Sequence, residues 1–168
     1  TLNGVSKSYC MTGWRLGYCG APKEIIAAMN KIQSQSTTST SSITMAAAVE
    51  AISGPQDFIT DHNNKFLRRR DLVVNKLNEI NGITCSKPDG AFYVYPNCQG
   101  ILGKVTPSGN KISSDEDFVT FLLEDQGVAG VHGSAFGLSP YFRLSYATSD
   151  NILEDACNRI QLACSKLK

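Results

Sequence analysis

The strongest constraint on the fold is a long stretch of helical periodicity in the middle of the chain. From Phe58 to Ile80, apolar side chains recur about every 3.6 residues, and the pair Asn81-Gly82 gives a C-terminal stop. Gly54-Pro55 ends the preceding pattern and suits the first turn of a new helix. A helix over residues 55–80 would be about 37 Å long. Because this exceeds the usual span of one small domain, we predict that the helix joins two lobes.

The chain before this helix is turn-rich at first and then helical. Residues 1–21 have no helical period, and we interpret them as a loop that leads into a short strand near residues 15–19. Pro22 opens a segment with one apolar helical face, which should end in the Ser/Thr-rich run 34–42. The Ala-rich residues 43–52 indicate a second helix, so we expect that run to be an ordered bend.

After the long helix the pattern changes to short β-like runs. Those at 83–85 and 91–95 flank a Pro-Asp-Gly turn and predict a hairpin. Ser113-Ser114, with an acid three residues beyond each, forms a capping-box signature for a helix that Gly127 ends. The remaining elements are two short strands, 128–131 and 141–147, and an amphipathic helix from 149 onward. The order predicts helices first and an α+β unit second.

Composition excludes several classes of protein. With 42% hydrophobic and 18% charged residues, the 168-residue chain has the composition of a globular protein. A formal net charge of +1 gives no field that would attract nucleic acid or an anionic membrane surface. No apolar run approaches the ~20 residues of a membrane span, and the first residues lack signal-peptide features. We therefore predict a cytoplasmic protein with neither nucleic acid nor a membrane as a partner.

The six cysteines do not predict a disulfide framework. They are scattered through a chain large enough to build a core, so we expect reduced thiols. Cys157 and Cys164 lie on one predicted helix with Cα atoms ~10 Å apart, beyond the reach of a disulfide. There is no CxxC pair and there are two histidines, so we predict no metal site.

The most informative segment is residues 4–18, Gly-Val-Ser-Lys-Ser-Tyr-Cys-Met-Thr-Gly-Trp-Arg-Leu-Gly-Tyr. It resembles the cofactor-lysine segment of class I/II aminotransferases, which are fold type I enzymes that use pyridoxal 5′-phosphate (PLP). The resemblance implies that Lys7 holds PLP as a Schiff base. It also implies that Arg15 pairs with the cofactor phosphate and that the Ser6 hydroxyl assists.

The chemistry explains why these residue types suit the task. A Schiff base forms through a neutral amine, whereas a free lysine has a pKa of about 10.4, so the site must favour deprotonation of Lys7. Arg15 supplies positive charge and a planar fork that can bind two phosphate oxygens at once. Glycines at 4, 13 and 17 let the backbone turn sharply and approach a ligand. The alternative is that both cations are solvated residues of a Gly/Ser loop.

A second block, Tyr-Phe-Arg-Leu-Ser-Tyr-Ala at residues 141–147, contains a further candidate. On a strand, Arg143 points to the face opposite Phe142 and Leu144. A covered arginine needs an anionic partner. In the aminotransferase resemblance, this arginine binds the substrate α-carboxylate in bidentate fashion. The alternative is an edge-strand arginine that faces water.

Two less specific motif matches belong to the same resemblance. Residues 90–93, Gly-Ala-Phe-Tyr, resemble the small-domain hairpin that lines the family's active-site mouth, although Phe92 equally suits a core. Residues 132–137 resemble the family's Pro-Gly-x-x-Phe-Gly loop, with His132 where proline is usual. Neither match adds a residue to the predicted site.

The resemblance runs over nearly the whole chain, and it implies an α/β fold. The chain would be the C-terminal portion of a PLP-dependent transferase of fold type I, comprising the end of the large domain and the α+β small domain. We predict domain boundaries at 1–54 for the large-domain part, 55–80 for the connecting helix and 81–168 for the small domain. The first helices should then expose apolar surface, because their sheet lies upstream.

Within the family, the resemblance is greatest to prokaryotic aspartate and aspartate/prephenate aminotransferases. It implies transfer of the amino group of L-aspartate to 2-oxoglutarate by a homodimer. The family's upstream half supplies the residues that hold the PLP ring, so we expect the fragment alone to be nearly inactive. Alternatives are another PLP reaction, such as a prephenate or aromatic transaminase or a C–S lyase, and a non-catalytic PLP-binding regulator domain.

Overall fold

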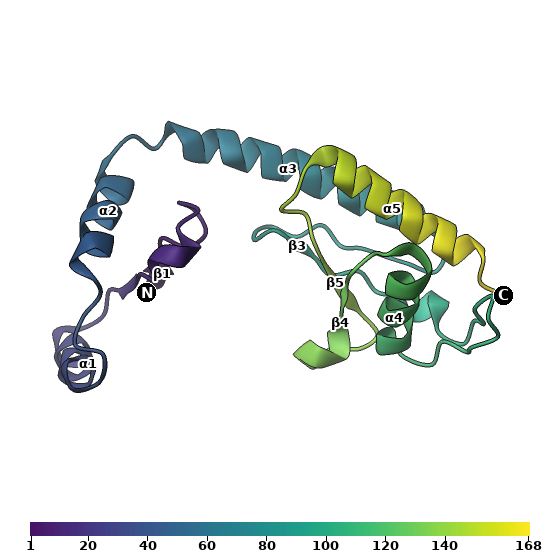
Figure 1. The fold of residues 1–168 in the computed structure, drawn as a ribbon, viewed down its shortest axis with the longest axis horizontal. Coiled ribbons are helices and arrows are strands. Elements are labelled where there is room, and N and C mark those ends of the chain that lie inside the picture. The colour runs from purple at the N-terminus through teal and green to yellow at the C-terminus, as the bar shows by residue number, and fades with distance from the viewer. The chain divides into compact units, whose positions relative to one another are not determined.

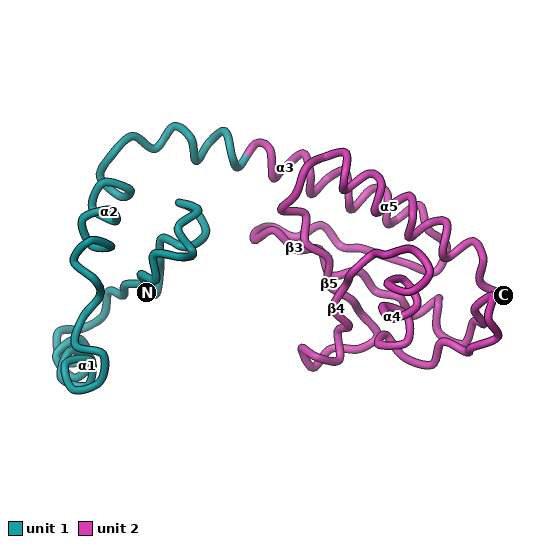
Figure 2. Tube along the Cα trace, in the orientation of Figure 1, with its two compact units in different colours: residues 1–63 teal, residues 64–168 magenta.

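A computed structural model describes all residues, 1–168, and divides into two compact units, residues 1–63 and 64–168 (Figure 2). The division lies within helix α3 (Asp57–Asn78), at the place where the sequence predicts the connecting helix. The domain boundaries at 54 and 80 stay predictions. None of the helices has the combination of length and apolarity needed to cross a membrane.

The first unit consists of a strand pair and helices (Figure 1). Strand β1 (Leu2–Gly4) pairs antiparallel with β2 (Gly17–Cys19), and a short 3₁₀ turn, η1 (Thr12–Trp14), lies between them. Helices α1 (Lys23–Ser36) and α2 (Ser42–Ser53) follow, which confirms both helices predicted upstream. Pro22 is the residue before the first helical turn, where its carbonyl accepts the Ile26 N–H.

The apolar faces of helices α1 and α2 are exposed to solvent. Ile25, Met29 and Ile32 on α1 are exposed, and so are four large apolar side chains of α2, namely Ile43, Met45, Val49 and Ile52. The unit's buried residues are Val5, Thr44 and Ala48. The predicted exposure of the first helices is therefore confirmed, and this unit has no substantial core of its own.

The second unit packs helices against a small antiparallel sheet. Its strands β3 (Tyr93–Val94), β4 (Val131–His132) and β5 (Phe142–Ser145) lie in the order β3-β5-β4, so β5 is central. Helix α5 (Asp150–Ser165) lies beside the second half of α3, and α4 (Asp115–Gln126) packs beside β4 (Figure 1). Two short 3₁₀ turns, η2 (Gln99–Ile101) and η3 (Gly133–Phe136), complete the unit.

The hairpin predicted between 83–85 and 91–95 is wrong in its main pairing. Strand β3 pairs with β5 instead, with Tyr93 opposite Ser145 and Val94 opposite Leu144. From the first run only Thr84 forms a bridge, to Asn97. The Asn78 side chain explains the difference, because its amide donates to the Cys85 carbonyl at 2.9 Å and accepts the Cys85 N–H at 2.8 Å. These bonds use the backbone groups that a longer hairpin would need.

The core of the second unit lies between α3, α5, α4 and the sheet. Leu77, Phe118, Phe142 and Ile160 are fully buried in it. Asp150, at the start of α5, accepts hydrogen bonds from Arg68 at 2.9 Å and Arg69 at 2.8 Å, so it ties α5 to α3. Two members of the arginine run 68–70 thus have a structural role.

Helix α4 begins with the capping box that the sequence predicts. Of the two candidate serines, Ser114 is the cap: its hydroxyl accepts the Asp117 N–H at 3.1 Å, and the Asp117 carboxylate accepts the Ser114 N–H at 3.0 Å. Gly127 ends the helix in the left-handed conformation, with φ of 66°. The start of α4 is therefore fixed in position, which matters below for its first residue, Asp115.

The uneven burial predicts uneven protection of backbone amides. In a solution of residues 1–168, amides of α1 and α2 should exchange with deuterium at least about tenfold faster than those of α4 and α5, because few buried contacts oppose their opening. Hydrogen–deuterium exchange read by mass spectrometry measures this directly. Equal protection of the four helices would contradict the contrast in burial.

Candidate functional site

The loop between β1 and β2 carries three of the predicted site residues, Ser6, Lys7 and Arg15. In the strand pair Gly4 lies opposite Gly17, and the Val5 N–H donates to the Leu16 carbonyl at 3.4 Å. The two ends of the loop are therefore held together. Lys7 follows Gly4 by three residues and Arg15 precedes Gly17 by two, so both leave the same end of the strand pair.

The glycines of this loop act differently from the expectation. A Cβ on Gly4 would lie 3.1 Å from the Leu16 carbonyl oxygen, so Gly4 allows the strands to approach closely. Gly13 has open space around it. The left-handed residues of the loop are Cys10 and Arg15, with φ of 55° and 53°. The sharp turns are thus made by non-glycine residues, which adopt this conformation uncommonly.

Lys7 opens a tight turn with an exposed side chain. Its carbonyl accepts the Cys10 N–H at 3.1 Å. On one side the turn is anchored by the buried Val5, whose carbonyl accepts the Met11 N–H at 3.4 Å. On the other side Tyr9 donates to the Gln56 side chain at 3.0 Å. Ser6 is half-buried between these anchors, and its assisting role stays a prediction.

Arg15 lies in the wall of a polar hollow of about 440 Å³. One of its guanidinium nitrogens, Nη1, donates to the Thr12 carbonyl at 2.9 Å. The rest of the lining is rich in hydroxyl groups and consists of Gly13, Trp14, Gln33, Thr37, Ser39, Thr40, Ser41 and Thr44. A guanidinium and several hydroxyls are donors that suit a phosphate group.

The hydroxyl side of this hollow was not predicted from the sequence. We interpreted the run 34–42 only as a bend between helices, and the signal that could have found it is the density of hydroxyl residues there. The bend is ordered, as expected, and in addition it faces the predicted phosphate-binding arginine.

Arg143 lies on β5, the central strand of the second unit, and is half-buried. Its guanidinium carbon is 4.3 Å from the ring centre of Tyr93 and 4.5 Å from that of Phe136. Phe142 and Tyr146 are buried on the opposite face, which confirms the predicted alternation. The alternative of an edge-strand arginine in water is excluded, because β4 and β3 flank the strand on both sides.

Aromatic residues around Arg143 extend this arrangement. Tyr95 stacks on Tyr141 with ring centres 5.4 Å apart and contacts Phe136 at 6.3 Å. Burial and the negative charge of Asp115 raise the pKa of Tyr95, and the positive charge of Arg143 opposes them. Tyr95 therefore keeps its proton and donates it to the carbonyls of Gly133 and Leu138, at 3.2 Å and 3.4 Å.

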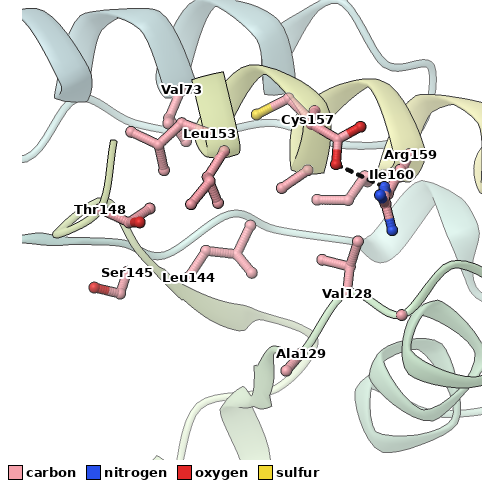
Figure 3. A pocket seen from close by; sticks show the side chains of 14 residues that line it. Val73, Val128, Ala129, Leu144, Ser145, Thr148, Leu153, Cys157, Arg159 and Ile160 are labelled. Atoms are coloured by element: carbon pink, nitrogen blue, oxygen red, sulfur yellow. Dashed lines mark ion pairs between the residues drawn. The ribbon is translucent and has the colours of Figure 1, made fainter. Parts of the chain in front are cut away.

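A second hollow, of about 390 Å³, lies in the second unit between α5 and the sheet (Figure 3). None of the predicted site residues lines it. Its walls are largely apolar, and its charged groups, Arg159 and Asp155, pair with each other at 2.8 Å. Burial raises the pKa of the Cys157 thiol there to about 11, so that thiol stays protonated at neutral pH.

The chain shows neither a disulfide nor a cluster of metal ligands. All six cysteines are free, and burial raises the pKa values of Cys98 and Cys164 to about 12. No three His, Cys, Asp or Glu side chains gather in a way that could hold a metal ion. The roles of Lys7, Arg15 and Arg143 therefore stay predictions at this point.

Comparison with known proteins gives the family. The model for "Aminotransferase class I and II" matches residues 1–160. The chain belongs to this aminotransferase family. The resemblance stated from residues 4–18 and 141–147 is thereby confirmed.

Individual relatives agree with the family match. The aspartate aminotransferase of Rhizobium meliloti (strain 1021) is 59% identical over 99% of this chain and 41% of its own length. A probable aspartate/prephenate aminotransferase of Rhizobium leguminosarum bv. phaseoli is 58% identical over 100% of this chain and 42% of its own length. The chain thus spans about two fifths of the length of these relatives.

Solved structures confirm the fold. The crystal structure of the aspartate aminotransferase from Rhizobium meliloti has a TM-score of 0.97 and 58% identity, and the match covers 100% of this chain and 42% of that one. The aromatic aminotransferase of Pyrococcus horikoshii OT3 has a TM-score of 0.87 and 35% identity, with 98% and 42% covered. The predicted fold, the C-terminal portion of an α/β aminotransferase, is correct.

The residue just before the turn 133–139 differs from the family pattern that the resemblance implies. His132 replaces the usual proline, and its Nδ1 lies 2.6 Å from the Ser134 hydroxyl. A Cβ on Gly133 would lie 2.1 Å from the Leu138 carbonyl oxygen, so only glycine fits. Ser134 donates its N–H to the buried Asp115 at 2.8 Å. Hydrogen bonds therefore hold this turn where the family has a proline.

The tight space at Gly133 yields a prediction. Gly133→Ala should destabilise the folded protein by about 1–3 kcal/mol, the usual cost of overpacking, because backbone oxygens surround the new methyl group. Gly130→Ala is the matched control, since its Cβ would meet Leu144 and Val119 at ordinary contact distances of 3.4 and 3.5 Å. Urea unfolding measures both, and an unchanged midpoint for Gly133→Ala would contradict the geometry.

Proposed function

We propose that this chain is part of a PLP-dependent aminotransferase that moves the amino group of L-aspartate to 2-oxoglutarate. The observation that carries the proposal is the β1–β2 register, which places Lys7 and Arg15 at one end of a strand pair. The names of the relatives at 59% and 58% identity, aspartate aminotransferase and aspartate/prephenate aminotransferase, support the substrate.

The residues of the first unit fit the cofactor. The Arg15 guanidinium and the hydroxyls of the bend 37–41 surround a hollow that suits a phosphate group. PLP, when bound, supplies an electron sink for negative charge at the substrate α-carbon. In this proposal Arg15 anchors the phosphate with two parallel N–H groups, which a lysine could not do.

Lys7 has two tasks in the proposal. Its amine, once neutral, would hold the cofactor covalently through the cofactor aldehyde, with release of water, between catalytic cycles. When substrate displaces it, the same amine takes a proton from the substrate α-carbon and later returns one, acting as general base and then general acid. The anchored turn 5–11 holds the lysine backbone in place for both tasks.

Arg143 binds the α-carboxylate of the substrate. The fork of a guanidinium matches the two oxygens of a carboxylate, so the contact fixes orientation as well as position. The Tyr93 and Phe136 ring centres lie 4.3 and 4.5 Å from the guanidinium carbon. Two ring contacts restrict how the guanidinium can rotate, which reduces the entropy lost on binding.

Other parts of the proposal concern the whole protein. We infer a cytoplasmic homodimer that needs the upstream part of the chain, since the relatives are more than twice as long. That part, or a partner subunit, would cover the exposed faces of α1 and α2. The aspartate/prephenate relatives favour prephenate-type transamination as the second candidate function.

Lys7 can be tested in the full-length protein. Lys7→Ala should abolish the visible absorbance of the lysine-bound cofactor and lower the transamination rate by about 10²–10⁴-fold, because the proton-transfer group is lost. Borohydride should attach the cofactor to the Lys7 peptide of the parent, as seen by mass spectrometry. The exposed Lys31→Ala serves as control. Unchanged absorbance in Lys7→Ala would rule out this lysine.

Arg143 gives a prediction about substrate. Arg143→Lys should reduce kcat/KM for L-aspartate by an amount equivalent to roughly 2–5 kcal/mol, because a bidentate contact is lost. The cofactor absorbance should be unchanged. Arg159→Lys, on the exposed face of α5, is the control and should behave like the parent. Steady-state kinetics measure kcat/KM for both variants. A parental kcat/KM in Arg143→Lys would show that Arg143 does not bind the substrate.

A further inference from the structure

Asp115 is a buried carboxylate to which the proposed chemistry assigns no part. It is the first residue of α4 and is only 1% exposed. One oxygen, Oδ2, accepts the Ser134 N–H at 2.8 Å, and the other, Oδ1, accepts the Ser139 hydroxyl at 3.1 Å. Both donors belong to the turn 133–139, so a single side chain holds this turn at its two ends.

The same turn carries one of the two rings that cover Arg143. Phe136 lies between Ser134 and Ser139, and its ring centre is 4.5 Å from the guanidinium carbon. Phe136 is 50% exposed, so burial alone holds it weakly. The position of Phe136 over Arg143 therefore depends on the conformation of the turn.

We propose that Asp115 is a positioning residue for substrate binding: by anchoring Ser134 and Ser139 it fixes the turn that places Phe136 on the Arg143 guanidinium. The inference rests on the proposed role of Arg143 and extends it to a residue that touches neither substrate nor cofactor. A guanidinium held by contacts with two rings is oriented before substrate arrives, whereas a mobile one must be ordered during binding.

The proposal predicts a defect in binding rather than in turnover. In the full-length protein, Asp115→Asn keeps the shape of the side chain but removes its negative charge, so the hydrogen bonds with Ser134 and Ser139 are no longer charge-assisted. KM for L-aspartate should rise by about tenfold, because both anchors of the turn weaken, while kcat changes by less than about threefold. The cofactor absorbance should match that of the parent.

Asp117→Asn is the matched control. Asp117 lies in the same first turn of α4, but its carboxylate accepts the N–H groups of Ser113 and Ser114, outside the turn 133–139. This variant should lower the stability of α4 and leave KM unchanged. A parental KM in Asp115→Asn, or an equal rise in KM in Asp117→Asn, would overturn the proposal.

A double-mutant cycle tests the route through Phe136. Phe136→Leu should raise KM by about three- to tenfold, because a cation–π contact is lost. In Asp115→Asn/Phe136→Leu the two effects should not multiply, since Asp115 acts through this ring. Fully multiplicative effects would overturn the proposed route. If Asp115→Asn does not fold, the cycle of Ser139→Ala with Phe136→Leu decides in the same way.

Binding of succinate, a dicarboxylate that cannot be transaminated, separates this inference from the proposed function. Calorimetry should show about tenfold weaker succinate binding in Asp115→Asn than in the parent. If the parent binds succinate in this Asp115-dependent way but transfers no amino group, the proposed function fails and the positioning role stands. If the parent is active and succinate binding is unchanged in Asp115→Asn, the positioning role fails.

Discussion

Antiparallel strand pairing determines where each candidate residue lies. In the first unit, the register of Gly4 opposite Gly17 brings the two ends of the lysine loop together. In the second, β5 lies between β3 and β4, with Tyr93 opposite Ser145 and Val131 opposite Arg143. A shift of either register by one residue would turn the side chains to the other face. The short strands thus bury Val94 and Phe142 in the core and also determine where the candidate residues lie.

The two units obtain their order from different sources. The second has a continuous core in which α3, α4, α5 and the sheet bury one another's apolar side chains. The first holds its loop mainly by backbone hydrogen bonds and by the anchors at Val5 and Tyr9, while α1 and α2 keep apolar faces exposed. Hydrogen bonds exposed to water stabilise weakly, whereas buried apolar area stabilises strongly. Accordingly, Arg143 lies on a strand that belongs to a packed core, whereas Lys7 lies on a turn that is exposed to water.

The sequence predicts the helices and most strands well, but it does not predict which strands pair with each other. Helix periodicity, the Ser114 cap and the Gly127 stop are local signals, and all three are confirmed. The alternation of Phe142, Arg143 and Tyr146 is also local, so the face that carries the arginine could be predicted. The rings around it could not, because Tyr93 lies near Arg143 only through the pairing of β3 with β5. Nor does the sequence show that Asn78, a helix residue, occupies the backbone of Cys85 and leaves Thr84 to bridge to Asn97.

The buried charge at Asp115 follows from what the turn 133–139 requires. Its donors, the Ser134 N–H and the Ser139 hydroxyl, need two acceptors in one place, and an ionised carboxylate has both. Burial raises the pKa of Asp115, but these hydrogen bonds outweigh it and leave the pKa below its usual value, so the charge persists at neutral pH. The turn's carbonyls at Gly133 and Leu138 need a donor instead, and Tyr95 provides one. An ionised carboxylate thus accepts from one set of turn groups and a protonated phenol donates to the other, so removing either side chain would leave turn groups without these partners.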